Sequence, residues 1–77
     1  MIFAIAMCMI FPGSVTQPAC RLANSYTFPT AEACKGRLQE MFPTLPEDEH
    51  GHKVLQDKPE VRSEWFCVQK PTWTPVQ

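Results

Sequence analysis

Several features that commonly reveal a function are missing from this sequence. Its basic residues are scattered singly between Arg21 and Lys70, and the net charge is −1, so we expect no nucleic-acid partner. No two cysteines have the close spacing of a zinc-binding pair. No serine lies in the glycine-containing elbow of an activated nucleophile. The sequence therefore predicts a protein that is not an enzyme, with no catalytic residue and no cofactor.

Charge is also missing from the first eleven residues, MIFAIAMCMIF. As a helix this run would rise only about 16 Å, roughly half of the ~30 Å hydrocarbon thickness, so we expect no membrane span. A signal peptide needs a positive leader and a small-x-small cleavage site. The run has no Lys or Arg, and Ser14–Thr16 is a poor cleavage site. Because both alternating rows of the run are apolar, we expect a central strand covered on both faces.

Export remains an alternative interpretation of the same run. Residues 1–16 would then be a removed signal peptide, and the rest would be a small, exported, disulfide-rich binding protein. Removal would discard Cys8 and leave three cysteines, an odd number that suits an oxidised domain poorly. The preferred interpretation is synthesis in the cytoplasm without a convincing signal peptide.

The rest of the chain has the helix-start, helix-stop and turn signals typical of a small α+β domain. Thr30 is a good helix N-cap, the apolar residues that follow recur at helical spacing, and Pro43 ends the pattern. Strands are expected at residues 1–11, 20–28 and 61–68, residues 53–56 are an optional further short strand, and residues 43–52 should form an acidic loop. We therefore predict one domain over residues 1–68, with a small antiparallel sheet of about three strands and one packed helix. Residues 69–77 should form an extended tail rich in proline.

The four cysteines are the natural stabilising elements of so short a chain. A single core of this size supplies only about 3–5 kcal/mol, so we expect two disulfides. With the first strand, the second strand and the helix alternating in direction, Cys8 lies beside Cys20, and Cys34 lies at the opposite end. A last strand beside the first brings Cys67 to Cys34. This topology predicts Cys8–Cys20 and Cys34–Cys67, although a bend at Asn24 and Ser25 would permit Cys20–Cys34.

One helix can cover only one face of such a sheet, yet the first strand is apolar on both. We expect an exposed apolar row that binds a protein partner or a second copy of the chain. Trp73 in the tail is a further contact candidate, because it has little of its own domain to pack on. The predicted interface residues are Phe3, Ile5, Met7, Met9, Phe11 and Trp73.

The two histidines, His50 and His52, follow three acidic residues in the 43–52 loop. Imidazoles and carboxylates on one flexible loop could hold a divalent metal, but the spacing does not match regular zinc sites. We therefore predict a solvated acidic loop and no metal. A metal-binding module that uses His50 and His52 is the remaining alternative.

Four segments together resemble a group of small proteins. They are the apolar N-terminal segment with its cysteine, the proline-containing link to Cys20, the run Phe28-Pro29-Thr30-Ala31-Glu32-Ala33-Cys34, and Trp65-Phe66-Cys67-Val68. The chain is similar in these segments to small four-cysteine proteins of unknown function encoded by tailed phages and proteobacteria. The resemblance implies no catalytic residue. It implies a phage setting, in which a small disulfide-linked sheet with an apolar face resembles a virion accessory protein. Together with the exposed apolar row, this predicts a structural or interaction protein, an accessory or decoration component of a larger assembly such as a phage virion, in a virion or another oxidising, extracytoplasmic setting.

Overall fold

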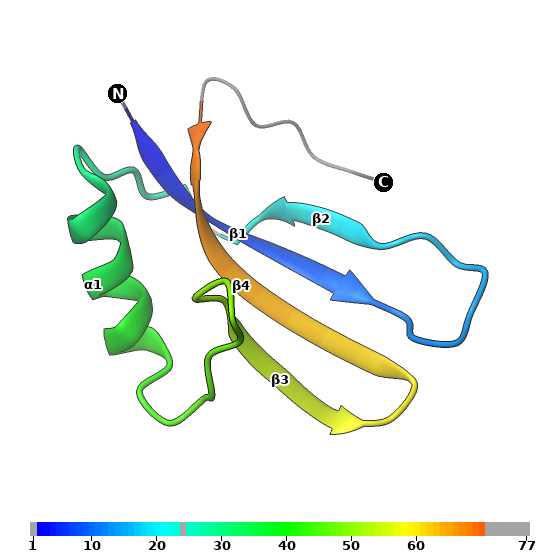
Figure 1. Ribbon diagram of the computed structural model, residues 1–77. Coiled ribbons are helices and arrows are strands. Elements are labelled where there is room, and N and C mark those ends of the chain that lie inside the picture. The colour runs from blue at the N-terminus through cyan, green and yellow to red at the C-terminus, as the bar shows by residue number, and fades with distance from the viewer. Residues whose placement is uncertain (1, 24, 71–77) are drawn as a thin grey trace.

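The computed structural model describes residues 2–23 and 25–70 of the chain. In this part the elements follow in the order β1 (Phe3–Ile10), β2 (Ala19–Leu22), α1 (Ala31–Met41), β3 (Lys53–Lys58) and β4 (Val61–Gln69). The strands form one antiparallel sheet in the order β2-β1-β4-β3, with α1 packed against it (Figure 1). The predicted α+β class is confirmed, with four strands where about three were expected. Trp73 lies outside the described residues.

The apolar N-terminal run forms an interior strand of the sheet. β1 lies between β2 and β4, and it pairs with β4 from Phe3 opposite Gln69 to Ile10 opposite Arg62. Ile5 and its neighbours Ala4 and Ala6 are at most 1% exposed. Ala4 and Ala6 point away from the helix and Ile5 points toward it, so β1 side chains are buried on both faces, which fits the absence of polar residues from this run.

β2 is shorter than the predicted strand over residues 20–28. Its four residues pair with β1 and bring Cys20 directly opposite Cys8. Regular pairing ends at Leu22 and returns only at Phe28, which exchanges two backbone hydrogen bonds with Phe3 at 2.8 and 2.9 Å. In place of the predicted strand, two short stretches pair with β1, and the residues between them leave the sheet.

The helix begins and ends where the sequence predicts. Thr30 has extended backbone angles, and its Oγ1 accepts a hydrogen bond of 3.1 Å from the Ala33 amide, which satisfies one of the free N–H groups of the first turn. After Met41 the Phe42 amide donates a last bond of 3.0 Å to the Leu38 carbonyl, and Pro43 stops the helix there. No helix in the described part of the chain has the length and apolar character of a membrane span.

The core lies between α1 and one face of the sheet. Cys34 and Leu38 of the helix meet Ile5, and six half-buried apolar residues surround these three: Phe3, Phe28, Met41, Phe42, Trp65 and Cys67. The prediction that the helix leaves the row of Phe3 and Ile5 exposed is therefore wrong. The two rows of β1 are both apolar, so the pattern could not indicate which of them faces the helix. Met7, Met9 and Phe11 follow in the same row and are half-buried.

Both predicted disulfides are present. Cys8–Cys20 joins the paired strands β1 and β2, and Cys34–Cys67 ties α1 to β4 within the core. The described residues contain no free cysteine. The antiparallel arrangement of β1 with both neighbours is what brings Cys20 to one end and Cys67 to the other, as the topological argument predicts.

Candidate functional site

The sheet face opposite α1 differs in composition from the core face. Side chains alternate between the two faces along each strand, and those opposite the helix define what we call the helix-free face. Its central row, from β1, is small and mostly buried. The flanking strands add half-buried apolar residues and one charged pair. The members are Ala4, Ala6, Cys8 and Ile10 of β1, Cys20 and Leu22 of β2, Val54 of β3, and Arg62, Glu64, Phe66 and Val68 of β4.

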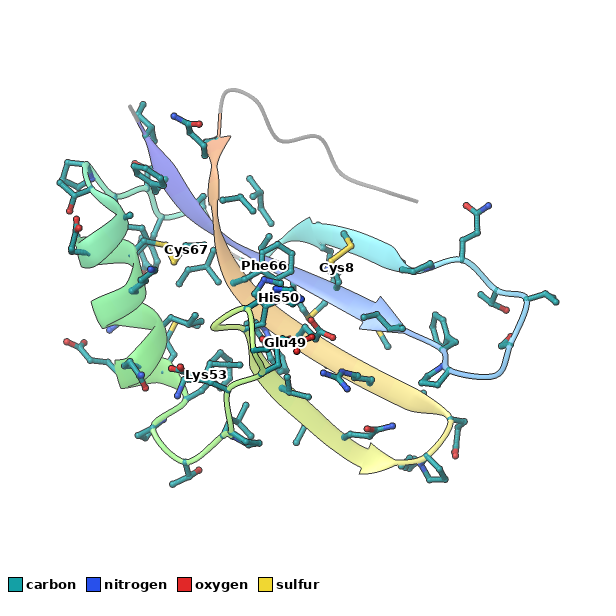
Figure 2. All side chains as sticks on the ribbon, in the orientation of Figure 1. Cys8, Glu49, His50, Lys53, Phe66 and Cys67 are labelled. Carbon is teal, nitrogen blue, oxygen red and sulfur yellow. A yellow bond between two sulfur atoms is a disulfide. The ribbon has the colours of Figure 1, made fainter. Side chains whose placement is uncertain are left out.

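A compact loop brings the acidic segment before β3 onto this face. Glu47 forms an isolated bridge with Lys53, and the Asp48 amide donates 2.9 Å to the His52 carbonyl. Gly51 has φ 78°, a left-handed conformation that glycine adopts without a side-chain clash, and it returns the chain toward β3. Figure 2 shows the loop beside the sheet near Phe66. The turn places Asp48 beside His52.

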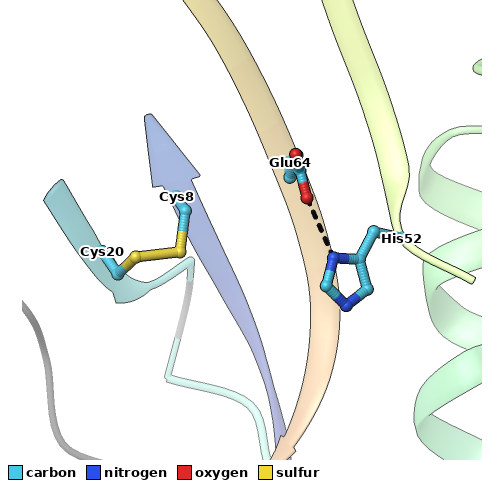
Figure 3. Close-up of a disulfide and its surroundings, with 4 residues drawn as sticks. All are labelled: Cys8, Cys20, His52 and Glu64. Atoms are coloured by element: carbon cyan, nitrogen blue, oxygen red, sulfur yellow. Dashed lines mark hydrogen bonds and ion pairs between the residues drawn. A yellow bond between two sulfur atoms is a disulfide. The ribbon is translucent and has the colours of Figure 1, made fainter. Parts of the chain in front are cut away.

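His52 is the centre of a polar cluster formed by the loop and β4. Its Nδ1 lies 2.9 Å from Glu64 Oε1, the contact drawn in Figure 3, and 3.8 Å from Asp48 Oδ2. Its ring stacks on Phe66, with centroids 4.2 Å apart and an interplanar angle of 19°. The stacking contact with Phe66 fixes the plane of the ring, and Glu64 Oε1 contacts one ring nitrogen. Together these two contacts determine the orientation of the imidazole.

Arg62 completes the cluster from the same strand as Glu64. Its Nε donates 2.8 Å to Glu64 Oε2, and its Nη2 lies 3.8 Å from Asp48 Oδ2. The side chains of Asp48, Glu64 and His52 are only 16%, 11% and 27% exposed. The cluster therefore places two carboxylates, one guanidinium and one imidazole in a partly dehydrated setting, where charge interactions are stronger than at an open surface.

The carboxyl group of Asp48 is held in its charged form. Partial burial raises its pKa, but the backbone amides of His52 and His50, both donating at 2.9 Å to Oδ1, and the electrostatic interactions with the side chains of His52 and His50 lower it by more. The net pKa lies below the ordinary value of 3.8. At neutral pH Asp48 is therefore an anion directed at His52.

The structure separates the two histidines that the sequence analysis treated as a pair. His50 is 69% exposed and its Nε2 lies 3.5 Å from Glu49, whereas His52 turns toward β4. The ring centroids of His50 and His52 are 5.8 Å apart. His52 is therefore held in place by neighbouring side chains, whereas His50 is largely exposed to solvent. Glu64 was missing from the predicted site, because the sequence places it only on an outward-facing row of the last strand.

A hollow lies between the helix and the acidic loop. It is lined by Lys35, Leu38, Gln39, Glu47 and Gly51. Gln39 Nε2 donates 2.7 Å to Glu47, and the buried Lys53 ammonium lies 3.5 Å from the same carboxylate and donates 3.3 Å to the Leu45 carbonyl. These contacts connect the loop to α1 and β3, so the polar groups around the hollow are explained by their role in holding the loop in place.

No protein-family model, no curated protein and no solved structure matches the chain. The helix-free face and the cluster around His52 are therefore the features on which a functional inference can rest.

Proposed function

We propose that the protein is a non-enzymatic interaction protein that binds a protein partner, or a second copy of itself, through the helix-free face. In this role it is a small accessory or decoration component of a larger assembly, for which the resemblance described above suggests a phage particle. The proposal places the partner surface on the opposite side of the sheet from the row that the sequence analysis selected.

One observation carries this proposal. The helix-free face holds half-buried apolar side chains next to one another: Leu22 and Phe66 both pair in register with the small Ala6, and Val68 pairs with Ala4. The core face, by contrast, is covered by α1 at the same positions along β1. Adjacent apolar side chains that a domain leaves partly in water are typical of protein-binding surfaces.

The disulfides support the setting of this function. Two cross-links in a chain of 77 residues fit an oxidising or extracellular environment. A surface component of a particle that leaves the cell would meet that environment. Stability then comes from the disulfides and the single core, and one sheet face stays available for binding.

Sedimentation velocity over a wide concentration range tests the proposal. The oxidised full chain should self-associate, or should bind particles purified from its native source. Val68→Lys places a charge on the helix-free face and should weaken that association at least about tenfold, since burying an unpaired charge at an interface is costly. Val15→Lys is the matched control, because Val15 is fully exposed in the β1–β2 connection, and it should leave association unchanged.

A negative result is equally clear. A wild-type chain that stays monomeric, binds no native particle and does not bind a hydrophobic dye would contradict the proposal. Equal effects of Val68→Lys and Val15→Lys would also contradict it, because the binding would then not depend on this face.

Export with loss of residues 1–16 is the rival proposal. The observation in its favour is the exposed segment at Ser14–Thr16, which an enzyme could reach. Its consequence would be severe, since residues 1–16 include all of β1 and Cys8. The non-reduced intact mass of the protein from its native source separates the two proposals. A full-length mass with two disulfides favours the first, and a chain that begins near Gln17 favours the second.

A further inference from the structure

The cluster on the helix-free face combines one imidazole nitrogen with two carboxylates from separate segments of the chain. Ligand atoms of Asp48, His52 and Glu64 all lie within 4.8 Å of one another. We propose that these three residues bind a divalent first-row transition metal ion, with Zn²⁺ as the natural probe, through His52 Nδ1 and one oxygen of each carboxylate. The inference is independent of the proposed protein-binding role.

The distances between the ligand atoms suit such an ion. Zn²⁺ binds nitrogen and carboxylate oxygen at about 2.0–2.2 Å, usually with tetrahedral geometry, which keeps ligand atoms about 3.4 Å apart. His52 Nδ1 lies 2.9 Å from Glu64 Oε1 and 3.8 Å from Asp48 Oδ2. One pair is slightly closer than that spacing and the other slightly wider, so small side-chain movements would admit the ion.

The arrangement of the second carboxylate points to a cation rather than to hydrogen bonding alone. His52 Nδ1 carries at most one proton, and Glu64 is the acceptor within hydrogen-bond distance. Asp48 Oδ2 also faces this nitrogen, but at 3.8 Å, and Arg62 Nη2 lies at 3.8 Å as well. Both distances exceed a hydrogen bond. A metal ion at the centre of the cluster would be coordinated directly by this partly buried anionic oxygen.

Each of the three ligands is oriented by a group outside the set. Phe66 stacks on the ring of His52, backbone amides hold Asp48 Oδ1, and Arg62 Nε holds Glu64 Oε2. These contacts leave Oδ2 and Oε1 facing Nδ1. Outer contacts of this kind fix the geometry of metal ligands and reduce the cost of ordering them.

The histidine selects the class of ion. Imidazole suits zinc, copper, iron and nickel, whereas Mg²⁺ and Ca²⁺ prefer oxygen ligands throughout. Coordination through Nδ1 requires the ring proton to reside on Nε2, the nitrogen on the side of the ring away from Glu64 in Figure 3. The positive charge of Arg62 opposes a second cation, so affinity should be moderate. Water, or a group from a bound partner, would supply the fourth ligand.

Isothermal titration calorimetry of the oxidised full chain with Zn²⁺ tests the site, and a parallel titration with Mg²⁺ tests a cation that prefers oxygen ligands. We expect about one Zn²⁺ per chain and no Mg²⁺ binding. His52→Gln should weaken Zn²⁺ binding at least about tenfold, and Asp48→Asn should act in the same direction. His50→Gln is the matched control: it removes an exposed histidine two positions away and should leave the affinity unchanged.

Near-UV circular dichroism establishes that each variant keeps the fold, and Glu64→Gln replaces His52→Gln if that variant does not fold. Failure of the wild-type chain to bind Zn²⁺ would overturn the proposal. An equal loss in His50→Gln and His52→Gln would overturn it too, because the ion would then sit on the exposed loop histidines. Neither result bears on self-association, so the proposed function is tested separately.

Discussion

The two faces of this sheet are made from the same strands, yet different forces hold them. On the core face, Ile5 and Cys34 have no exposed surface and pack within a cluster of apolar residues. On the helix-free face, Glu64 and His52 are joined to Arg62 and Asp48 by charged contacts of 2.8–3.8 Å. Burial of apolar surface stabilises the first face, and geometry-dependent polar contacts organise the second.

Each face also has its own disulfide, and the two cross-links do different work. Cys34–Cys67 closes a separation of 33 residues and fastens the helix to the sheet, whereas Cys8–Cys20 closes 12 residues between neighbouring strands. The longer closure restricts the unfolded chain more. The longer cross-link is also the one in the core, so we expect the core face to contribute more to the free energy of unfolding than the helix-free face.

Removal of the disulfides is the strongest test of this division. In the loop-entropy model, Cys34–Cys67 contributes about 4 kcal/mol and Cys8–Cys20 about 3 kcal/mol to the free energy of unfolding. Cys34→Ala/Cys67→Ala also removes a fully buried side chain from the core. We expect this double variant to lose more stability than Cys8→Ala/Cys20→Ala, measured by urea unfolding of chains in which the other disulfide is formed. The reverse order would mean that the helix-free face contributes more to folding than the core face.

Single truncations on the two faces sharpen the same comparison. Ile5→Ala opens a cavity beneath α1 and should cost about 2–5 kcal/mol of unfolding free energy. Phe66→Ala should cost only about 1–2 kcal/mol, because Phe66 is half-buried rather than fully buried and loses mainly its stacking on His52. Ile5→Val is the control for small changes at the buried site, at about 0.5–1.5 kcal/mol. Equal losses for Ile5→Ala and Phe66→Ala in denaturant unfolding would remove the distinction between the faces.

The sequence was informative wherever a local rule determines the structure. The N-cap at Thr30 and the proline at position 43 delimit α1. The doubly apolar run predicted an interior strand, and the up-and-down topology then predicted both disulfides. The choice of face for Phe3 and Ile5 could not be predicted, because two apolar rows look alike in sequence and only the packing of the helix separates them.

The cluster around His52 could not be predicted for a different reason, which is register. Lys58 pairs with Val61 beside the turn, but a register shift follows, so that Val54 pairs with Glu64 and Lys53 with Trp65. Without that shift, the pairing set by the turn would place His52 on the side of Cys67, facing the helix. A one-residue shift moves every side chain to the other face. Nothing in the residues of the turn indicates it.

The smallest expected effect concerns acid, and it isolates the charge of Asp48. Because the pKa of this carboxyl lies below 3.8 in the folded chain, its charge contributes stability above that pH, and the contribution is lost as the pH falls through the folded-state pKa. Asp48→Asn should therefore unfold at a lower urea concentration than the wild type at pH 7, and the difference should shrink below about pH 3.8. Glu49→Gln, which changes a carboxyl that is 85% exposed, is the control and should change stability little. A difference between Asp48→Asn and the wild type that stays constant with pH would show that the amide disturbs the loop by its shape, and that the charge on the helix-free face adds nothing to folding.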